Sequence, residues 1–246
     1  MWWVLLCIAI LIVLEKSGSL RTRIPQLFKP QEYFWLFLNL VVLSMVTSAL
    51  MPAITGFFDF FYVQRFIDLV QYPVYLQFLV FLLVVDFLKF GTHYFLHRFQ
   101  FLWKIHSIHH SSEEINTLAA FKHSWLEAFL NLFLISLLSR VLVVEFSVLG
   151  IINTLLLSVC IWQHSKIRYI NVPILSAVFV TPKNHRIHHE LRNDSNHQNY
   201  GLFFNVWDRL FGTFTLDEGT SPKYGITEPS YPYESKLKQF FYPFFR

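Results

Sequence analysis

Residues 82–110 read LLVVDFLKFGTHYFLHRFQFLWKIHSIHH, so an apolar run passes directly into a segment rich in histidine. Residues 185–189 repeat part of this pattern. The histidines form three groups in which later members follow the first by three or four residues: His93 and His97; His106, His109 and His110; and His185, His188 and His189. On a helix such residues lie on one face, so each group can direct its imidazoles to one place.

The number of histidines predicts two metal ions. At a frequency of 11 histidines in 246 residues, the pattern His-x-x-His-His is expected about 0.02 times by chance, yet it occurs twice. Imidazole is the commonest protein ligand for zinc, iron, copper and nickel. Because one ion takes only about four to six ligands, the eight grouped imidazoles favour a dinuclear centre. A structural zinc site would not need so many histidines on separate segments.

The composition indicates a helical membrane protein. Hydrophobic residues make up 54% of the chain and charged residues 15%, against about 45–50% and 25% in soluble proteins. The mean hydropathy is +0.42, and phenylalanine alone occurs 28 times. These values exclude a disordered chain, a coiled coil and an ordinary cytosolic globule. The two cysteines lie inside apolar runs, so the sequence gives no basis for predicting a disulfide framework.

The apolar runs predict an all-α membrane bundle of about four to five helices. A short helix is expected over residues 1–14, and longer ones over 33–58 and 69–85. Residues 126–163 are too long for one span and predict a hairpin that turns near 140–145, whereas 174–180 is too short to span. The expected organisation is membrane helices over 1–81, a histidine-bearing domain over 82–217 that includes the hairpin 126–163, and a tail over 218–246.

The loop charges predict the orientation in the membrane. Lysine and arginine are concentrated between the first two runs, in residues 86–125 and after 164, and this places them in short loops rather than on a nucleic-acid-binding surface. The loop 59–68 contains only Arg65, and the hairpin tip only Arg140. The positive-inside rule then puts the histidine segments and the C-terminus on the cytoplasmic side. No nucleic-acid partner is expected.

Taken together, the motifs resemble the fatty acid hydroxylase/sterol desaturase superfamily of integral-membrane di-iron oxygenases, and bacterial members most closely. The resemblance covers roughly residues 82–216. Its motifs are Asp86, the three histidine groups, Lys122-His123-Ser124-Trp125-Leu126-Glu127, Gln163-His164-Ser165, Asn199-Tyr200-Gly201 and the run from Trp207 to Thr213. Three positions depart from the family pattern: Tyr94 follows His93 where arginine is usual, Ser124 replaces proline, and Lys166 replaces asparagine.

The resemblance implies a metal-ligand set and its metals. It implies two iron ions, with zinc able to substitute in recombinant material, and dioxygen as co-substrate. The implied ligands are His93, His97, His106, His109, His110, His185, His188 and His189. His164 joins them by the same resemblance, His123 is a further candidate, and His197 is left out.

Two carboxylates outside the histidine groups have expected roles. An intramembrane carboxylate is costly and usually serves a site, so Asp86 is expected to orient a ligand histidine by accepting its second N–H. The simpler alternative is that Asp86 pairs with Lys89. For Asp208 we expect an ion pair with Arg209 that closes the tail over the metal domain.

The implied function is O2-dependent hydroxylation or desaturation of an unactivated C–H bond in a lipid, either sterol, fatty acyl or related. The chain has no His-Pro-Gly-Gly haem motif, so we expect a separate electron donor of cytochrome b5 or ferredoxin type with its reductase. A bacterial inner membrane is favoured over the endoplasmic reticulum. Two alternatives stay open: a catalytically silent membrane scaffold that holds metal, and a metal-ion transporter, whose ligands should lie near the bilayer midplane.

Overall fold

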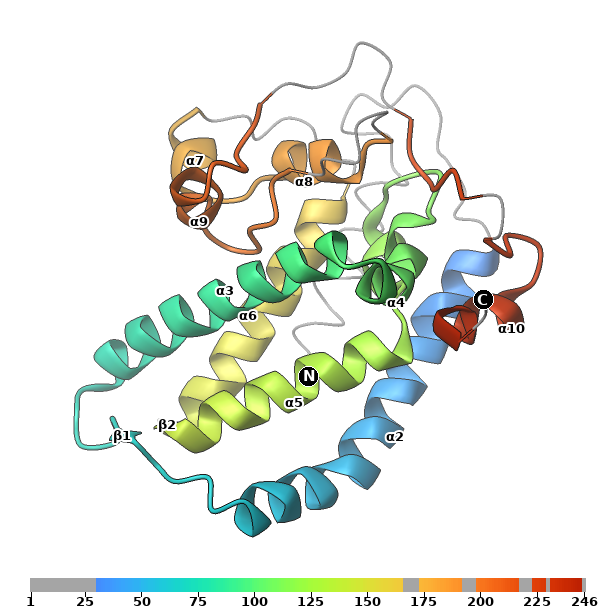
Figure 1. Cartoon of the computed structure of the whole chain (residues 1–246). Coiled ribbons are helices and arrows are strands. Elements are labelled where there is room, and N and C mark those ends of the chain that lie inside the picture. Colours follow the sequence, from blue (N-terminus) through green and yellow to red (C-terminus); the bar gives the residue numbers. More distant parts are fainter. Residues whose placement is uncertain (1–29, 166–172, 192–197, 217–222, 229–230, 245–246) are drawn as a thin grey trace.

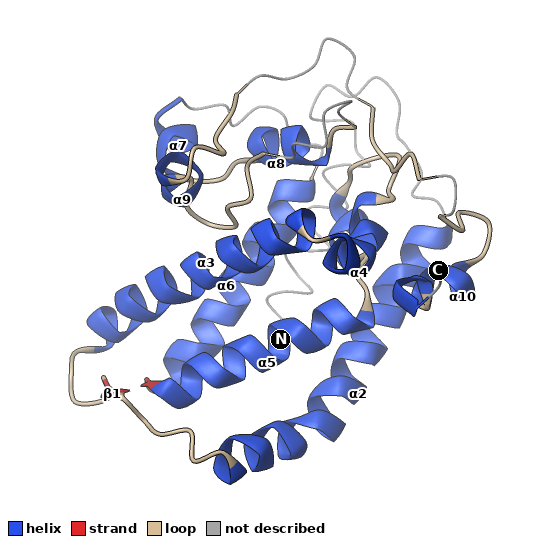
Figure 2. Cartoon of the chain, viewed as in Figure 1, coloured by secondary structure: helices blue, strands red, loops and turns tan. Residues whose placement is uncertain are grey.

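The computed structural model describes residues 30–165, 173–191, 198–216, 223–228 and 231–244. Within these ranges the chain is mostly helical, and its two strands have two residues each (Figure 2). The predictions for residues 1–14 and for Lys166 and His197 lie outside the described ranges.

Four long helices form the body of the molecule (Figure 1). They are α2 (Pro30–Phe60), α3 (Val74–Arg98), α5 (Trp125–Val141) and α6 (Phe146–His164). Among the described helices, α3 and α6 are both long and apolar enough to cross a membrane. Helices α5 and α6 occupy the region where the sequence predicts a hairpin, and the chain turns between them at residues 142–145.

The short elements gather at the end of the bundle where α3 and α6 finish (Figure 1). In chain order they are α4 (Gln100–His110), η1 (Thr117–Phe121), α7 (Pro173–Val178), α8 (Pro182–His189), α9 (Val206–Leu210), α10 (Lys236–Phe240) and η2 (Tyr242–Phe244). At the opposite end, β1 (Ile67–Asp68) pairs in parallel with β2 (Leu142–Val143) and ties the loop before α3 to the α5–α6 turn.

Local sequence sets where the histidine-bearing helices begin. Phe99 adopts an extended backbone (φ −104°, ψ 125°), which separates α3 from α4 and so divides the first two histidine groups between two helices. Thr181 and Asn184 form a reciprocal capping box, and Pro182 occupies the first turn of α8. Ser124, which replaces the usual proline, caps α5 through a hydrogen bond from Leu126 N.

The largest apolar cluster lies away from the histidines. Its buried members come from the loop before α3, from α3, from the end of α5 and the α5–α6 turn, and from α6: Leu69, Phe81, Leu82, Val85, Leu138, Leu142, Val144, Val148, Ile152 and Leu156. The histidine end combines buried polar side chains with two smaller apolar clusters, one of Ala120, Phe121 and Ile161 and one of Trp35, Ile108, Tyr231 and Tyr242.

Asp86 does not contact a histidine as expected. Both of its carboxylate oxygens accept hydrogen bonds from a segment more than 110 residues away: Phe203 N at 2.8 Å, Phe204 N at 3.1 Å and Trp207 Nε1 at 2.9 Å. The alternative pairing with Lys89 is also wrong, because Lys89 Nζ donates to Asn131 Oδ1 on α5. Asp86 therefore fastens the 203–207 segment to α3 rather than orienting a ring directly.

The expected Asp208–Arg209 ion pair is likewise absent from the described residues. Asp208 is buried and accepts hydrogen bonds from Tyr200 N, Gly201 N and Thr213 Oγ1, each at 2.7 Å. The Arg209 guanidinium instead lies 3.9 Å from the centre of the Phe214 ring. Burial raises the pKa of Asp208, and these three hydrogen bonds act in the opposite direction.

Replacing Asp86 by asparagine should destabilise the fold. An amide would direct an NH2 group at N–H donors, so we expect the free energy of unfolding to fall by about 2–4 kcal/mol. That corresponds to a Tm lower by about 5–15 °C in detergent solution. Asp59→Asn is the matched control, because the Asp59–Arg140 pair is exposed and its loss should cost less than about 1 kcal/mol. Equal Tm values for both variants would contradict this role of Asp86.

Candidate metal centre

Nine of the predicted ligands meet in two compact groups. His93, His97, His106, His110 and His188 form the first group, and His109, His164, His185 and His189 form the second. Within each group one ring nitrogen per histidine lies within 4.8 Å of the others. The first group draws on α3, α4 and α8, and the second on α4, α6 and α8. Each His-x-x-His-His motif therefore contributes to both groups.

The hydrogen bonds of the rings show which nitrogens face each other. In the second group, His109 Nδ1 and His164 Nδ1 lie 3.3 Å and 2.8 Å from the carbonyl oxygens of Lys122 and Cys160. A carbonyl only accepts, so each Nδ1 must carry the proton. The two Nε2 atoms are then bare, yet they lie 3.1 Å apart.

The first group repeats this arrangement. His93 Nδ1 lies 2.8 Å from the Tyr200 carbonyl oxygen, and His106 Nδ1 lies 3.1 Å from Glu127 Oε1. Their Nε2 atoms, bare by the same reasoning, are again 3.1 Å apart. His188 Nδ1 is held at 2.8 Å by the Gln198 carbonyl oxygen, and its Nε2 lies 3.1 Å from His110 Nε2.

A metal ion fits this donor set. Two bare nitrogens at 3.1 Å cannot hydrogen-bond, and their lone pairs repel unless a cation lies between them. Two nitrogens bound to one ion at about 2.1 Å and at a right angle to each other would lie about 3.0 Å apart. The observed separations of 3.0–3.1 Å agree with this value in both groups.

Electrostatics keeps the rings neutral, as ligands must be. Burial, followed by repulsion between neighbouring imidazoles, holds the pKa values of His109, His185 and His189 well below their usual value. At neutral pH these rings therefore present a lone pair rather than a second N–H.

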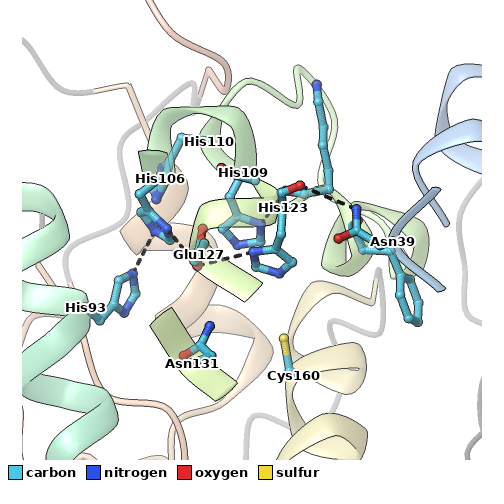
Figure 3. A network of polar contacts seen from close by, with 12 residues as sticks. Asn39, His93, His106, His109, His110, His123, Glu127, Asn131 and Cys160 are labelled. Atoms are coloured by element: carbon cyan, nitrogen blue, oxygen red, sulfur yellow. Dashed lines mark hydrogen bonds and ion pairs between the residues drawn. The ribbon is translucent and has the colours of Figure 1, made fainter. Parts of the chain in front are cut away.

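His123, a further candidate ligand, lies outside both groups. Its ring stacks on His109 with centroids 4.3 Å apart, and its Nδ1 lies 3.3 Å from Glu127 Oε1 (Figure 3). Burial acts to lower the pKa of His123, but the neighbouring Glu127 carboxylate outweighs it and raises the pKa to about 10. The raised pKa favours a protonated ring, which has no lone pair for a metal, and His123 lies beside His109 rather than among the converging nitrogens of either group.

The Asn-Tyr-Gly segment holds the first group from outside. The Tyr200 carbonyl accepts from His93, and the Tyr200 ring packs against His93, His97 and His188. Asn199 adopts a φ of 58°, in the left-handed region of backbone conformations that asparagine enters more readily than most residues. At Gly201 a Cβ atom would lie 2.7 Å from the Phe204 carbonyl oxygen and 2.8 Å from Asp208 Oδ2. Only glycine therefore lets the Asp208 carboxylate approach and fix the Tyr200 carbonyl.

The chain matches the family model for fatty acid hydroxylases over residues 78–213, more than half of its length. The chain belongs to the fatty acid hydroxylase family. The matched range includes both histidine groups, Glu127 and the Asn-Tyr-Gly segment. No solved structure matches the chain.

Curated relatives share this part of the chain. Alkylglycerol monooxygenase from Homo sapiens is 31% identical over 160 residues, which cover 65% of this chain and 35% of that protein. The protein of the same name from Danio rerio is 32% identical over 158 residues, covering 64% and 34%. The ornithine lipid hydroxylase OlsE of Rhizobium tropici is 25% identical over 144 residues, covering 58% and 43%. The chain thus spans about a third of the length of the first two relatives.

The sequence did not reveal the oxygens that fix the rings. Glu127 was visible as part of a motif, but nothing in the spacing indicated that its Oε1 atom serves both His106 and His123. The carbonyl acceptors of Lys122, Gln198 and Tyr200 have no sequence signal, because every residue carries a backbone carbonyl. Only the family's closing Asn-Tyr-Gly motif hinted that this segment lies near the metals.

Two variants on one helix test whether the groups are separate sites. His188 and His185 are both buried on α8 but belong to different groups. We expect the wild type to bind two metal ions per chain and His188→Ala and His185→Ala to bind about one each, because each loses a ligand from one group. Protein from iron-supplied cells, purified without chelator or nickel column, would be measured by elemental analysis. His123→Ala is the control and should keep both ions; a wild type with one ion or none would contradict the two-site arrangement.

Glu127→Gln should weaken metal binding without removing a ligand. The neutral amide oxygen is a weaker acceptor than the carboxylate, so the interaction that sets the His106 tautomer becomes weaker. We expect metal affinity to fall about 10–100-fold, measured by competition with a chelator. Glu145→Gln, at the end of α6 opposite to His164, is the control and should leave the affinity unchanged. An unchanged affinity in Glu127→Gln would contradict the orienting role.

Proposed function

We propose that this protein is a membrane-associated di-iron oxygenase that hydroxylates a lipid, with O2 as oxidant and electrons from a separate donor. The observation that supports this most directly is the pair of histidine groups, each with bare ring nitrogens 3.1 Å apart. Neutral imidazole sites suit iron, zinc and copper, and the family membership favours iron. The printed names of the relatives, a lipid monooxygenase and a lipid hydroxylase, favour a lipid substrate and hydroxylation over desaturation.

Bound iron would supply the activation of O2 and the oxidation of a C–H bond. The chain's own residues bind and orient. His93, His106, His109, His164 and His188 are locked by hydrogen bonds at Nδ1, so their Nε2 atoms cannot rotate away from the metal positions. Tyr200 and Trp103 pack against His97 and limit the access of water to the first group.

The location of the site also supports a lipid substrate. His93 and His97 lie in the last two turns of α3 and His164 ends α6, the two described helices that are long and apolar enough to cross a membrane. A lipid moving laterally in the bilayer can reach such a position without leaving the membrane. We place this end of the bundle on the cytoplasmic side, as the distribution of basic residues suggests.

The proposed reaction is tested with isotopically labelled oxygen. The protein would be loaded with iron in nanodiscs of total lipid extract, reduced by a cytochrome b5 or ferredoxin system, and exposed to 18O2. We expect lipid products that are heavier by one 18O atom, detected by mass spectrometry, and none from the His188→Ala variant. Two bound irons without any O2-dependent product would favour the metal-holding scaffold. Products lighter by two hydrogens would instead identify a desaturase.

A further inference from the structure

A half-buried lysine lies directly below the histidine layer. Lys89 precedes His93 by four residues on α3, so the two share a helix face about 6 Å apart along the axis. Its ammonium donates to Asn131 Oδ1 on α5, which is its only hydrogen-bond partner among the residues that the structure describes. An ammonium has three N–H donors, so two stay available. A lysine facing the interior of an apolar helix bundle is costly unless a site needs it.

An unused acceptor lies on the same side. Asn131 follows Glu127 by four residues, so both occupy one face of α5, and Figure 3 shows them one above the other next to Cys160. Glu127 is 5% exposed and gives Oε1 to His106 and His123, while its Oε2 has no partner within the described ranges. Glu127 also lies close enough to act electrostatically on Lys89. An ammonium whose hydrogen-bond partner is Asn131 thus lies near a carboxylate with an unpartnered oxygen.

The backbone of α5 lies close to α2 but not to α3 or α6 at most positions. The long Lys89 side chain bridges the separation between α3 and α5. Lys89 and Asn131 are both half-buried, so neighbouring side chains do not cover them completely.

We propose that Lys89, Asn131 and Glu127 form a subsite for a hydroxyl group of the lipid substrate. The hydroxyl oxygen accepts a hydrogen bond from Lys89, and the hydroxyl O–H donates a hydrogen bond to Glu127 Oε2. Both groups thereby gain a partner. An ether or ester oxygen would satisfy only the lysine, and a carboxylate would be repelled by Glu127. Because the other oxygen of Glu127 binds a ligand histidine, the oxidised carbon lies within a few bonds of the hydroxyl. The inference rests on the proposed function for the identity of the ligand as substrate.

The test is a binding experiment that needs no turnover. Zinc-loaded protein in detergent would bind a long-chain alcohol, its methyl ether and the carboxylate of equal chain length, in competition with a fluorescent fatty-chain probe. We expect the alcohol to bind about tenfold more tightly than the ether, as one hydrogen bond to a charged group allows. Lys89→Met should weaken the alcohol and the ether alike, by about tenfold with two zinc ions retained, because both oxygens accept from the lysine, and Lys89→Arg should preserve the affinity of both.

A matched control distinguishes the subsite from a purely structural role of Lys89. Asn153→Leu, which removes an exposed asparagine from α6, should leave the preference for the alcohol unchanged. Alcohol and ether affinities that are unchanged in Lys89→Met, or a carboxylate that binds more tightly than the alcohol in the wild type, would overturn the proposed subsite. Loss of zinc from Lys89→Met together with weaker binding of all three ligands would also overturn it and assign Lys89 to holding α3 and α5 together. A failed oxygenation test with an intact alcohol preference would refute the proposed reaction but not the subsite.

Discussion

The structure depends on one requirement: ring nitrogens with exposed lone pairs must be held within about 3 Å of each other. Without a cation such an arrangement is repulsive, so the fold must prevent each ring from turning or taking up a proton. Backbone carbonyl oxygens lie next to the Nδ1 atoms of His93, His109, His164 and His188, and a Glu127 carboxylate oxygen lies next to that of His106. Burial favours the neutral form of the rings. The surrounding loops are shaped by the need to bring those oxygens into place, rather than by their own packing.

The segment 198–208 illustrates this dependence. It supplies two carbonyl acceptors, from Gln198 and Tyr200, to rings on two different helices. Its own path is fixed by two buried carboxylates, Asp86 from α3 and Asp208 from within the segment. Both carboxylates therefore act on the metal site through the backbone that they hold. This explains how an aspartate seven residues before His93 can matter without touching any histidine.

The sequence predicted that the eight grouped histidines serve one dinuclear centre, and the family resemblance added His164. Helix spacing fixes the face on which each ring lies, but it did not indicate that each His-x-x-His-His motif is divided between the two groups. The sequence also predicted the helical class and a turn near residues 140–145, since both follow from the lengths of the apolar runs.

It failed for Asp86 and Asp208, whose partners include backbone N–H groups that every residue offers. It also gave His123 the status of a possible ligand, because the Glu127 carboxylate that favours its protonated form approaches only in the folded chain.

The ends of the helices contribute negative electrostatic potential at the two histidine groups. The histidines of the two groups lie in the last two turns of α3, α4, α6 and α8, so the C-terminal ends of four helices lie near the two groups. Each C-terminus carries about half a negative charge from its unsatisfied carbonyls, which favours cations. Neutral imidazoles would not compensate the charge of two divalent ions, and Glu127 places one carboxylate against the His106 ring. The converging helix ends supply the remaining negative potential without carboxylates that would bind protons or compete with the histidines as ligands.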